Sequence, residues 1–314
     1  MTTIFFNGKE YDIRTTTTLD CHNEDITEIP DKLVNLTILN CSGCPIRKLP
    51  ETLNKLVILN CSGCKNLFLI PRNLPELTML NCNGCEKIRC IPTLPKLIRL
   101  DCNECPLLVL DIETSRKLTH LDVSRTSTDL IPMNLNNLRE LKCSYTQIKK
   151  IPDTLTKLTH LECLYCPIKE IPNTLTKLTK LNCLATKVKE IPNTLIDLDK
   201  LNCTFCDIEN IPNTLNKLTE LVCGTCPIKQ IPDTLTKLNF LDITNCKVTK
   251  LPKTLTSLVY VNVDKMFILE RSKLPSIKNV YCLENDIYLF KVDDSNIIPD
   301  GEIQTLEEWL KNNK

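Results

Sequence analysis

Residues 158–177, LTHLECLYCPIKEIPNTLTK, are the stretch that decides the fold, because the chain goes on to repeat it. The next three stretches read LTKLNCLATKVKEIPNTLID, LDKLNCTFCDIENIPNTLNK and LTELVCGTCPIKQIPDTLTK, so the period is 20 residues. A fixed period of about 20 residues is typical of a solenoid, in which each turn stacks on the next. The same phase, with two steps of 21 residues, recurs at Leu36, Leu56, Leu77, Leu97, Leu118, Leu138, Leu238 and Leu258.

One turn of this solenoid cannot fold alone. Its pattern is L-x-x-L-x-C-x-x-C-x-I-x-x-I-P-x-x-L, and the named apolar positions predict one inward-facing set. Burying a large aliphatic side chain stabilises by about 1.5–3 kcal/mol, whereas ordering the chain costs about 1.5 kcal/mol per residue. The turns must therefore share a core, and each Leu-x-Cys segment must pair in parallel with its neighbours. The proline has no amide hydrogen, so it belongs on the convex side, outside the sheet.

This pattern resembles the leucine-rich repeat, L-x-x-L-x-L-x-x-N/C-x-L, with cysteine at the third aliphatic position. The resemblance covers residues 16–287, in about 13–14 units. It implies a leucine-rich-repeat solenoid with a parallel β-sheet on the concave face and a mostly irregular convex side. The short period and the I-P-x-T-L ending resemble short bacterial repeats. The phrases IPNTLTKLT and LNCS resemble leucine-rich-repeat proteins of giant amoeba-infecting DNA viruses (mimivirus-like), which implies a viral protein.

Both ends of the array are expected to carry caps, because an open core face would aggregate. Residues 1–15 predict a β-hairpin with a tight turn at Asn7-Gly8. Residues 288–314 predict a last strand followed by a capping helix that is N-capped by Asp300. The expected helix runs over residues 301–312 and has an apolar stripe of Ile303, Leu306 and Leu310.

The chain is close to neutral, with 39 basic and 38 acidic residues and a formal net charge of +1. This balance does not favour nucleic acid as a partner. Residues 1–6 lack the basic and apolar segments of a signal peptide, and no apolar run approaches about 18 residues, so no membrane span is expected. Twenty cysteines in such a chain should stay reduced. We therefore expect a cytoplasmic protein, in the host cytoplasm if it is viral, with no membrane partner.

The cysteines allow two interpretations, a zinc site or a core of free thiols. The repeat favours the core, because other turns hold Val123 and Ile243 at the first cysteine position and Thr126 and Thr186 at the second. A zinc ligand would not be exchanged for these residues, whereas a free thiol behaves as a small hydrophobe. The resemblance implies that the second position hydrogen-bonds the backbone where the chain leaves the strand. We expect no cofactor. The C-x-x-C pairs are Cys41/Cys44, Cys61/Cys64, Cys82/Cys85, Cys102/Cys105, Cys163/Cys166, Cys203/Cys206 and Cys223/Cys226.

Side chains alternate along a strand, so the residues that flank each central leucine face the concave side. Near the N-terminus this face carries Asn40, Asn60 and Asn81, which are expected to form a ladder between strands. Further along, aromatic and aliphatic residues gather among charged ones, a composition typical of binding hot spots. The alternative is the ordinary exposure of scattered residues. The predicted partner-binding patch comprises Tyr145, His160, Glu162, Leu164, Tyr165, Lys180, Leu184, Lys200, Phe205, Phe240 and Tyr260.

His120, Glu140 and His160 occupy equivalent positions in three consecutive turns, with about 4.8 Å between neighbouring strands. Such a row is a weak candidate for a metal site or for acid–base chemistry. The alternative is a solvated row of charges, which Lys142 beside it favours because its ammonium would repel a cation. We therefore assign no metal to it.

The sequence shows no phosphate-binding loop, nucleophile elbow or zinc-protease helix, so we expect no enzyme activity. The function that fits best is a monomeric protein–protein interaction scaffold that binds a partner on its concave face. A viral protein that engages a host protein is one form of it. The alternative is a binder of glycan, nucleic acid or metal through the same face.

Overall fold

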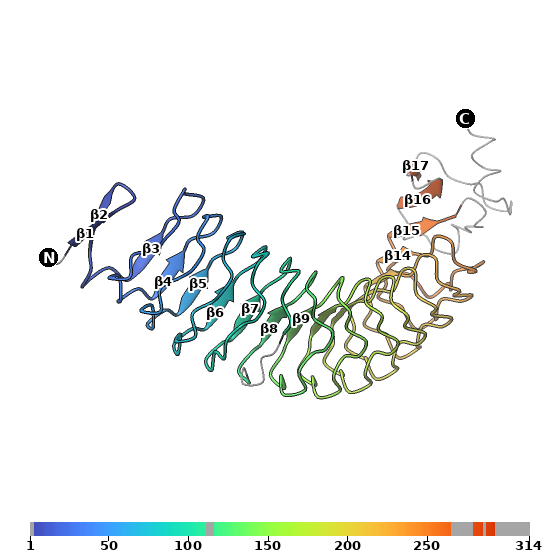
Figure 1. Cartoon of the computed structure of the whole chain (residues 1–314). Helices are drawn as coiled ribbons and strands as arrows, with labels where there is room; N and C mark the ends of the chain where they lie inside the picture. The colour runs from blue at the N-terminus through green and yellow to red at the C-terminus, as the bar shows by residue number, and fades with distance from the viewer. Residues whose placement is uncertain (1–2, 111–115, 265–278, 285–286, 293–314) are drawn as a thin grey trace. The chain divides into compact units, whose positions relative to one another are not determined.

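The computed structural model describes residues 3–110, 116–264, 279–284 and 287–292. The chain forms two compact units, Met1–Leu158 (unit 1) and Thr159–Lys314 (unit 2), and each is a stack of short turns (Figure 1). The concave strands of each unit are parallel, and turns without helix make up the described part of the convex side. The predicted solenoid with its irregular convex side is therefore confirmed. Over the same residues, no helix is long and apolar enough to span a bilayer.

Unit 1 begins with the predicted hairpin, in which β1 (Thr3–Phe6) pairs antiparallel with β2 (Lys9–Asp12). Asn7 and Gly8 both have positive φ, 50° and 74°, as the tight turn requires. The hairpin forms a two-stranded sheet of its own and does not extend the parallel sheet. It is instead tied to the first turn by the Asn35 side-chain amide, which donates to the carbonyls of Ile13 and Arg14 at 3.1 Å each.

The parallel strands of unit 1 are three residues long and pair in register, so that their central leucines lie side by side, as Leu19 does beside Leu39. Every one of these central leucines is buried. The stack is drawn in blue to green in Figure 1. The strands are β3 (Thr18–Asp20), β4 (Ile38–Asn40), β5 (Ile58–Asn60), β6 (Met79–Asn81), β7 (Arg99–Asp101), β8 (His120–Asp122) and β9 (Glu140–Lys142).

Unit 2 continues the same pattern and ends differently. Its last strand, β17 (Ile287–Val292), pairs antiparallel with β16 (Asn279–Glu284), which confirms the strand predicted at residues 288–292. The capping helix predicted at residues 301–312 lies outside the described residues. The other strands, all parallel, are β10 (His160–Glu162), β11 (Lys180–Asn182), β12 (Lys200–Asn202), β13 (Glu220–Val222), β14 (Phe240–Asp242) and β15 (Tyr260–Val263).

The inward set predicted from the repeat is buried as expected. In the turn that begins at β10, its members are 5% exposed or less. On the convex side, the threonine of each I-P-x-T-L motif links neighbouring turns, as Thr214 does by donating its hydroxyl to the Asn193 carbonyl at 2.6 Å. The buried members in this turn are Leu161, Cys163, Cys166, Ile168, Ile171 and Leu175.

Each cysteine that the structure describes is a free thiol, and all of them except Cys90 and Cys246 are buried. Burial raises the pKa of the Cys102 and Cys163 thiols well above the ordinary value, so these groups stay protonated. The cysteines therefore serve the core here, as the substitutions by valine and threonine predict.

The second cysteine position connects neighbouring turns. The Cys226 thiol donates to the Cys203 carbonyl of the preceding turn at 3.0 Å. Where this position holds threonine, the hydroxyl donates within its own turn instead, as Thr186 does to the Cys183 carbonyl at 2.8 Å. The expected backbone hydrogen bond is therefore present, but its partner depends on the residue. The same inter-turn contact is made by Cys44, Cys64, Cys85, Cys105, Cys206 and Cys246.

Thiol counting tests the assignment of the cysteines to the core. In the native protein, we expect a disulfide reagent to react quickly with the exposed Cys90 and slowly with the buried thiols. After denaturation, nearly all twenty cysteines should react. Cys90→Ser is the matched control, since it should remove only the fast phase. Fast reaction of many thiols, or stoichiometric zinc in protein purified without added metal, would contradict the assignment.

Two substitutions at Cys226 separate its hydrogen bond from its volume. Cys226→Ala should lower the free energy of unfolding by about 1–2 kcal/mol, because the Cys203 carbonyl keeps the Cys206 amide but loses the thiol of the next turn as a donor, and the turns lose contact. Cys226→Thr should cost less, since a threonine hydroxyl can donate to the carbonyl of its own turn, as at Thr186. The measurement is the denaturant midpoint of each variant. Equal losses in the two variants would show that a hydrogen-bond donor at this position contributes nothing to stability.

Candidate functional site

The concave side of each unit is formed by the two residues that flank each central leucine. In β10 and β13 both flanking residues are half-buried, whereas in β11 and β12 the first flanking residue is exposed. We call these positions the first and second flanking rows. The strands beneath them pair in the same parallel register from turn to turn within each unit, so the side chains distinguish one part of the face from another.

The second flanking row is rich in asparagine and aspartate, and these side chains have a structural role. The Asn182 side-chain oxygen accepts a hydrogen bond from the Leu184 amide at 3.3 Å, and Asn202 does the same for the Thr204 amide at 3.1 Å. Asn40, Asn60 and Asn81, which were expected to form a ladder between strands, therefore each accept a hydrogen bond within their own turn, and Asn40 also contacts Asp20 of the neighbouring strand. The residues of unit 1 that accept in this way are Asp20, Asn40, Asn60, Asn81 and Asp122.

A third row follows the strands, at the residue directly before the second cysteine position. Every described member has a left-handed backbone, with φ between 55° and 73°. Glycine and asparagine adopt this conformation readily, whereas bulky residues do so rarely. We call it the left-handed row. Its members are Asn23, Gly43, Gly63, Gly84, Glu104, Arg125 and Tyr145 in unit 1, and Tyr165, Ala185, Phe205, Thr225 and Asn245 in unit 2.

Three aromatic residues occupy this row although it disfavours them. Tyr145, Tyr165 and Phe205 have φ of 58°, 55° and 59° and are 44%, 51% and 59% exposed. A left-handed residue other than glycine costs roughly 1–2 kcal/mol. About half of the surface of each residue stays exposed, so these rings bury less than a core side chain does. Strain kept at exposed positions makes these three residues candidates for a functional surface.

The predicted patch divides between the two units. Tyr145 lies in unit 1, where the Arg125 guanidinium carbon stands 4.3 Å from the centre of its ring, within the range of a cation–π contact. All other predicted residues lie in unit 2. Of these, Lys180, Lys200, Tyr165, Phe205 and Tyr260 are exposed, and His160, Glu162, Leu164, Leu184 and Phe240 are half-buried.

The two lysines of unit 2 differ in their partners. Lys200 donates to a Glu220 carboxylate oxygen at 2.6 Å, and this contact raises the pKa of Lys200. Lys180 is exposed and forms no ion pair within the described part of the chain. Lys180 is therefore the cation of this face that is available to a partner.

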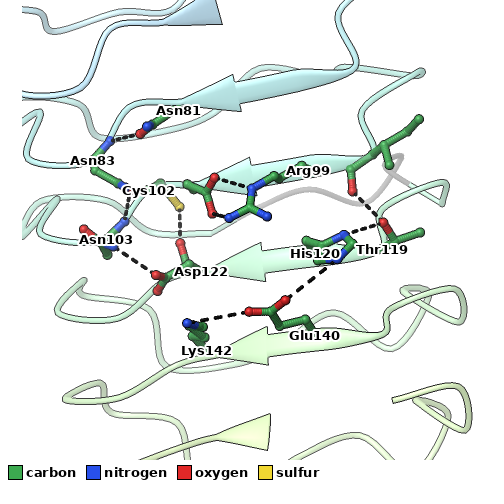
Figure 2. Close-up of polar contacts among 12 residues, drawn as sticks. Asn81, Asn83, Arg99, Cys102, Asn103, Thr119, His120, Asp122, Glu140 and Lys142 are labelled. Carbon is green, nitrogen blue, oxygen red and sulfur yellow. Dashed lines mark hydrogen bonds and ion pairs between the residues drawn. The ribbon is translucent and has the colours of Figure 1, made fainter. Parts of the chain in front are cut away.

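The charged part of the unit 1 face holds separate polar clusters (Figure 2). Arg99 donates two hydrogen bonds to Asp101, at 2.6 and 3.1 Å, and this contact raises the pKa of Arg99. On the next strands, His120 lies 3.8 Å from Glu140, whose other carboxylate oxygen lies 3.6 Å from Lys142. These groups are already satisfied by one another.

The row of His120, Glu140 and His160 is divided between the units as well. His120 Nδ1 lies 2.7 Å from the Thr119 hydroxyl, and His160 Nδ1 lies 2.9 Å from the Thr159 hydroxyl. Across the described ranges, no cluster of three or more histidine, cysteine, aspartate or glutamate side chains is arranged to hold a metal ion. In unit 1, His120 and Glu140 of this row form a group of polar side chains with Lys142.

Sequence reasoning missed an apolar stripe in unit 1. After Thr18, the first flanking row there continues with Ile38, Ile58 and Met79, of which Ile38 and Met79 are 38% and 41% exposed. In each of these strands an asparagine lies on the other side of the leucine, and the sequence analysis considered only the asparagines. The signal was present, because the same register that places Arg99 and His120 on the concave side also places these three residues there.

These features define the class of protein: a solenoid whose short parallel strands form an exposed concave sheet. The Leucine Rich Repeat family profile matches residues 35–56. The fold is that of a leucine-rich-repeat protein. A comparison with curated proteins finds no match.

Solved structures share this fold over most of the chain. An internalin (inlF) from Listeria monocytogenes has a TM-score of 0.69 and 21% identity over 88% of this chain and 89% of that protein. A functional domain of InlJ from the same organism, which includes a cysteine ladder, has a TM-score of 0.68 and 25% identity over 86% of this chain and 64% of that domain. The LRR protein LIC12759 from Leptospira interrogans has a TM-score of 0.66 and 20% identity over 83% of this chain and 82% of that protein.

The strain in the left-handed row can be measured. Phe205→Gly should leave the free energy of unfolding unchanged or raise it by up to about 1 kcal/mol, because relief of the backbone strain offsets the entropy that glycine adds to the unfolded chain. Leu201→Ala, in the neighbouring strand, is the contrasting variant and should cost about 2–5 kcal/mol. Denaturant titrations compare the two. A loss above about 1 kcal/mol in Phe205→Gly would show that the ring supports the fold.

Proposed function

We propose that the chain is a non-enzymatic scaffold that binds a protein partner on the concave side. The observation that carries this proposal is the retention of Tyr165 and Phe205 at exposed, strained positions. A protein that needed only a stable solenoid would gain from glycine there, as unit 1 has at Gly43 and Gly63. Large aromatic rings are the side chains that contribute most to protein–protein contacts.

The surroundings of these rings support a protein partner. Leu164 lies half-buried in the turn of Tyr165, and Leu184 lies half-buried in the turn between the two rings; lysine and glutamate side chains border them in the flanking rows. An apolar centre with a charged rim is the usual composition of a protein interface. A rigid backbone beneath the site also lowers the entropy that binding costs.

We further propose that the chain acts as a monomer in a cytoplasm. The support for this setting is the large number of free thiols, which a reducing compartment would preserve. A viral protein that engages a host protein is the specific form that we propose, and its support is the resemblance of the repeat phrases to those of giant amoeba-infecting viruses.

Affinity capture from an amoebal lysate tests this function. The wild-type chain should retain one or a few proteins, and Tyr165→Ala/Phe205→Ala should retain them at least about tenfold less, since two hot-spot residues contribute upwards of about 2 kcal/mol. Quantitative mass spectrometry of the retained proteins gives the ratio.

Phe68→Ala is the matched control for this experiment, because Phe68 is a 53% exposed aromatic residue outside the concave rows. It should leave retention unchanged. If the double variant retained the same proteins as the wild type, the proposed interface would be wrong.

A further inference from the structure

One part of the unit 2 face has a composition that points to a particular kind of partner, if the function proposed above holds. It comprises Tyr165, Lys180, Leu184 and Phe205 together with Asn182, and we call it the docking surface. These residues come from three consecutive turns whose strands, β10 to β12, pair in parallel. With about 4.8 Å between strands, the surface extends over roughly 10 Å.

The apolar side of the docking surface lies in the turns that follow the strands. Tyr165 and Phe205 stand two turns apart and are 51% and 59% exposed, and Leu184 lies half-buried in the turn between them. Ala185 occupies the left-handed row in that middle turn, so no large side chain separates the two rings in this row. An apolar side chain of a partner can therefore rest on Leu184 between the rings.

The opposite side of the docking surface is cationic. Lys180 is the first flanking residue of the middle strand, is exposed, and has no ion pair among the described residues. Its neighbour Lys200 is held by Glu220 at 2.6 Å. The other charged or titratable residues of these strands are His160 and Glu162 on β10. A carboxylate from a partner is the group that would complement Lys180.

Asn182 lies between the apolar side and Lys180. Its side-chain oxygen accepts from the Leu184 amide at 3.3 Å, so the orientation of the amide group is fixed. Its side-chain nitrogen has no partner among the residues that the structure describes and remains a donor. A peptide carbonyl or a carboxylate accepts from such a donor.

We propose that the docking surface binds an acidic peptide segment of the protein partner. Apolar side chains of the segment pack on Leu184 between Tyr165 and Phe205, and an aspartate or glutamate pairs with Lys180. A single-stranded nucleic acid could also stack on the rings, but it needs a run of cations along its backbone. Here Glu220 neutralises Lys200, and Glu162 would repel a phosphate.

Selection from random peptides displayed on phage tests this proposal with the whole chain as the target. The enriched peptides should combine acidic with aliphatic or aromatic residues. One enriched peptide is then synthesised, and its dissociation constant is measured by fluorescence anisotropy. Lys180→Glu should weaken binding at least about tenfold, and replacing the acidic residues of the peptide by lysine should restore binding to that variant.

Lys187→Glu is the matched control, because Lys187 is an exposed lysine of the same turn that lies outside the concave rows. It should leave the affinity unchanged. Enriched peptides that are neutral or basic, or an affinity that Lys180→Glu does not change, would overturn the proposal. Tighter binding of poly(dT) than of the peptide, lost in Lys180→Glu, would assign the surface to nucleic acid and overturn it too.

The same experiment separates this proposal from the function on which it rests. If selected peptides lose affinity in Tyr165→Ala/Phe205→Ala but carry no acidic preference, the concave scaffold stands and the acidic partner is wrong. If the affinity of every selected peptide is unchanged in Tyr165→Ala/Phe205→Ala, both the concave binding site and the acidic peptide partner are wrong.

Discussion

The structure depends on one constraint: no turn can satisfy its own backbone or bury its own apolar side chains. Three-residue strands such as β10 gain their hydrogen bonds only from the strands beside them. The other contacts repeat this dependence, since convex hydroxyls such as that of Thr214 reach the preceding turn, and so do thiols such as that of Cys226. Stability is therefore a property of pairs of turns, as expected for a quasi-one-dimensional array.

This constraint fixes the backbone and leaves the concave side chains free to vary. The left-handed row shows the division clearly, because Gly43, Glu104 and Tyr165 share a left-handed backbone but have side chains of different chemistry. The scaffold would accept glycine throughout. Where it holds an aromatic ring instead, the left-handed backbone and the exposure of the ring make the position a candidate for an interface.

The repeat alone was sufficient to predict the solenoid, the parallel register and the buried set, because each follows from period and alternation, and the Asn-Gly dipeptide was sufficient to predict the turn at Asn7-Gly8. It did not predict that Cys226 bonds to the preceding turn while Thr186 bonds to its own, because a sequence position does not specify the direction of a donor. The positive φ of Tyr165 was hidden as well, since nothing in an aromatic residue signals a left-handed backbone. The stripe that includes Met79 was visible in the register and was overlooked.

The hydrogen bonds that hold the turns together reach only from one turn to the next, over about 20 to 24 residues of chain. Removing one whole turn would bring together two surfaces that already match, and inserting one would create no unfamiliar contact. Near-identical phrases such as IPNTLTKL, at residues 171–178, also favour unequal recombination between copies of the coding sequence. Relatives of this chain can thus differ in length by complete turns. The number of turns can change during evolution without a change in the residues that the remaining turns expose.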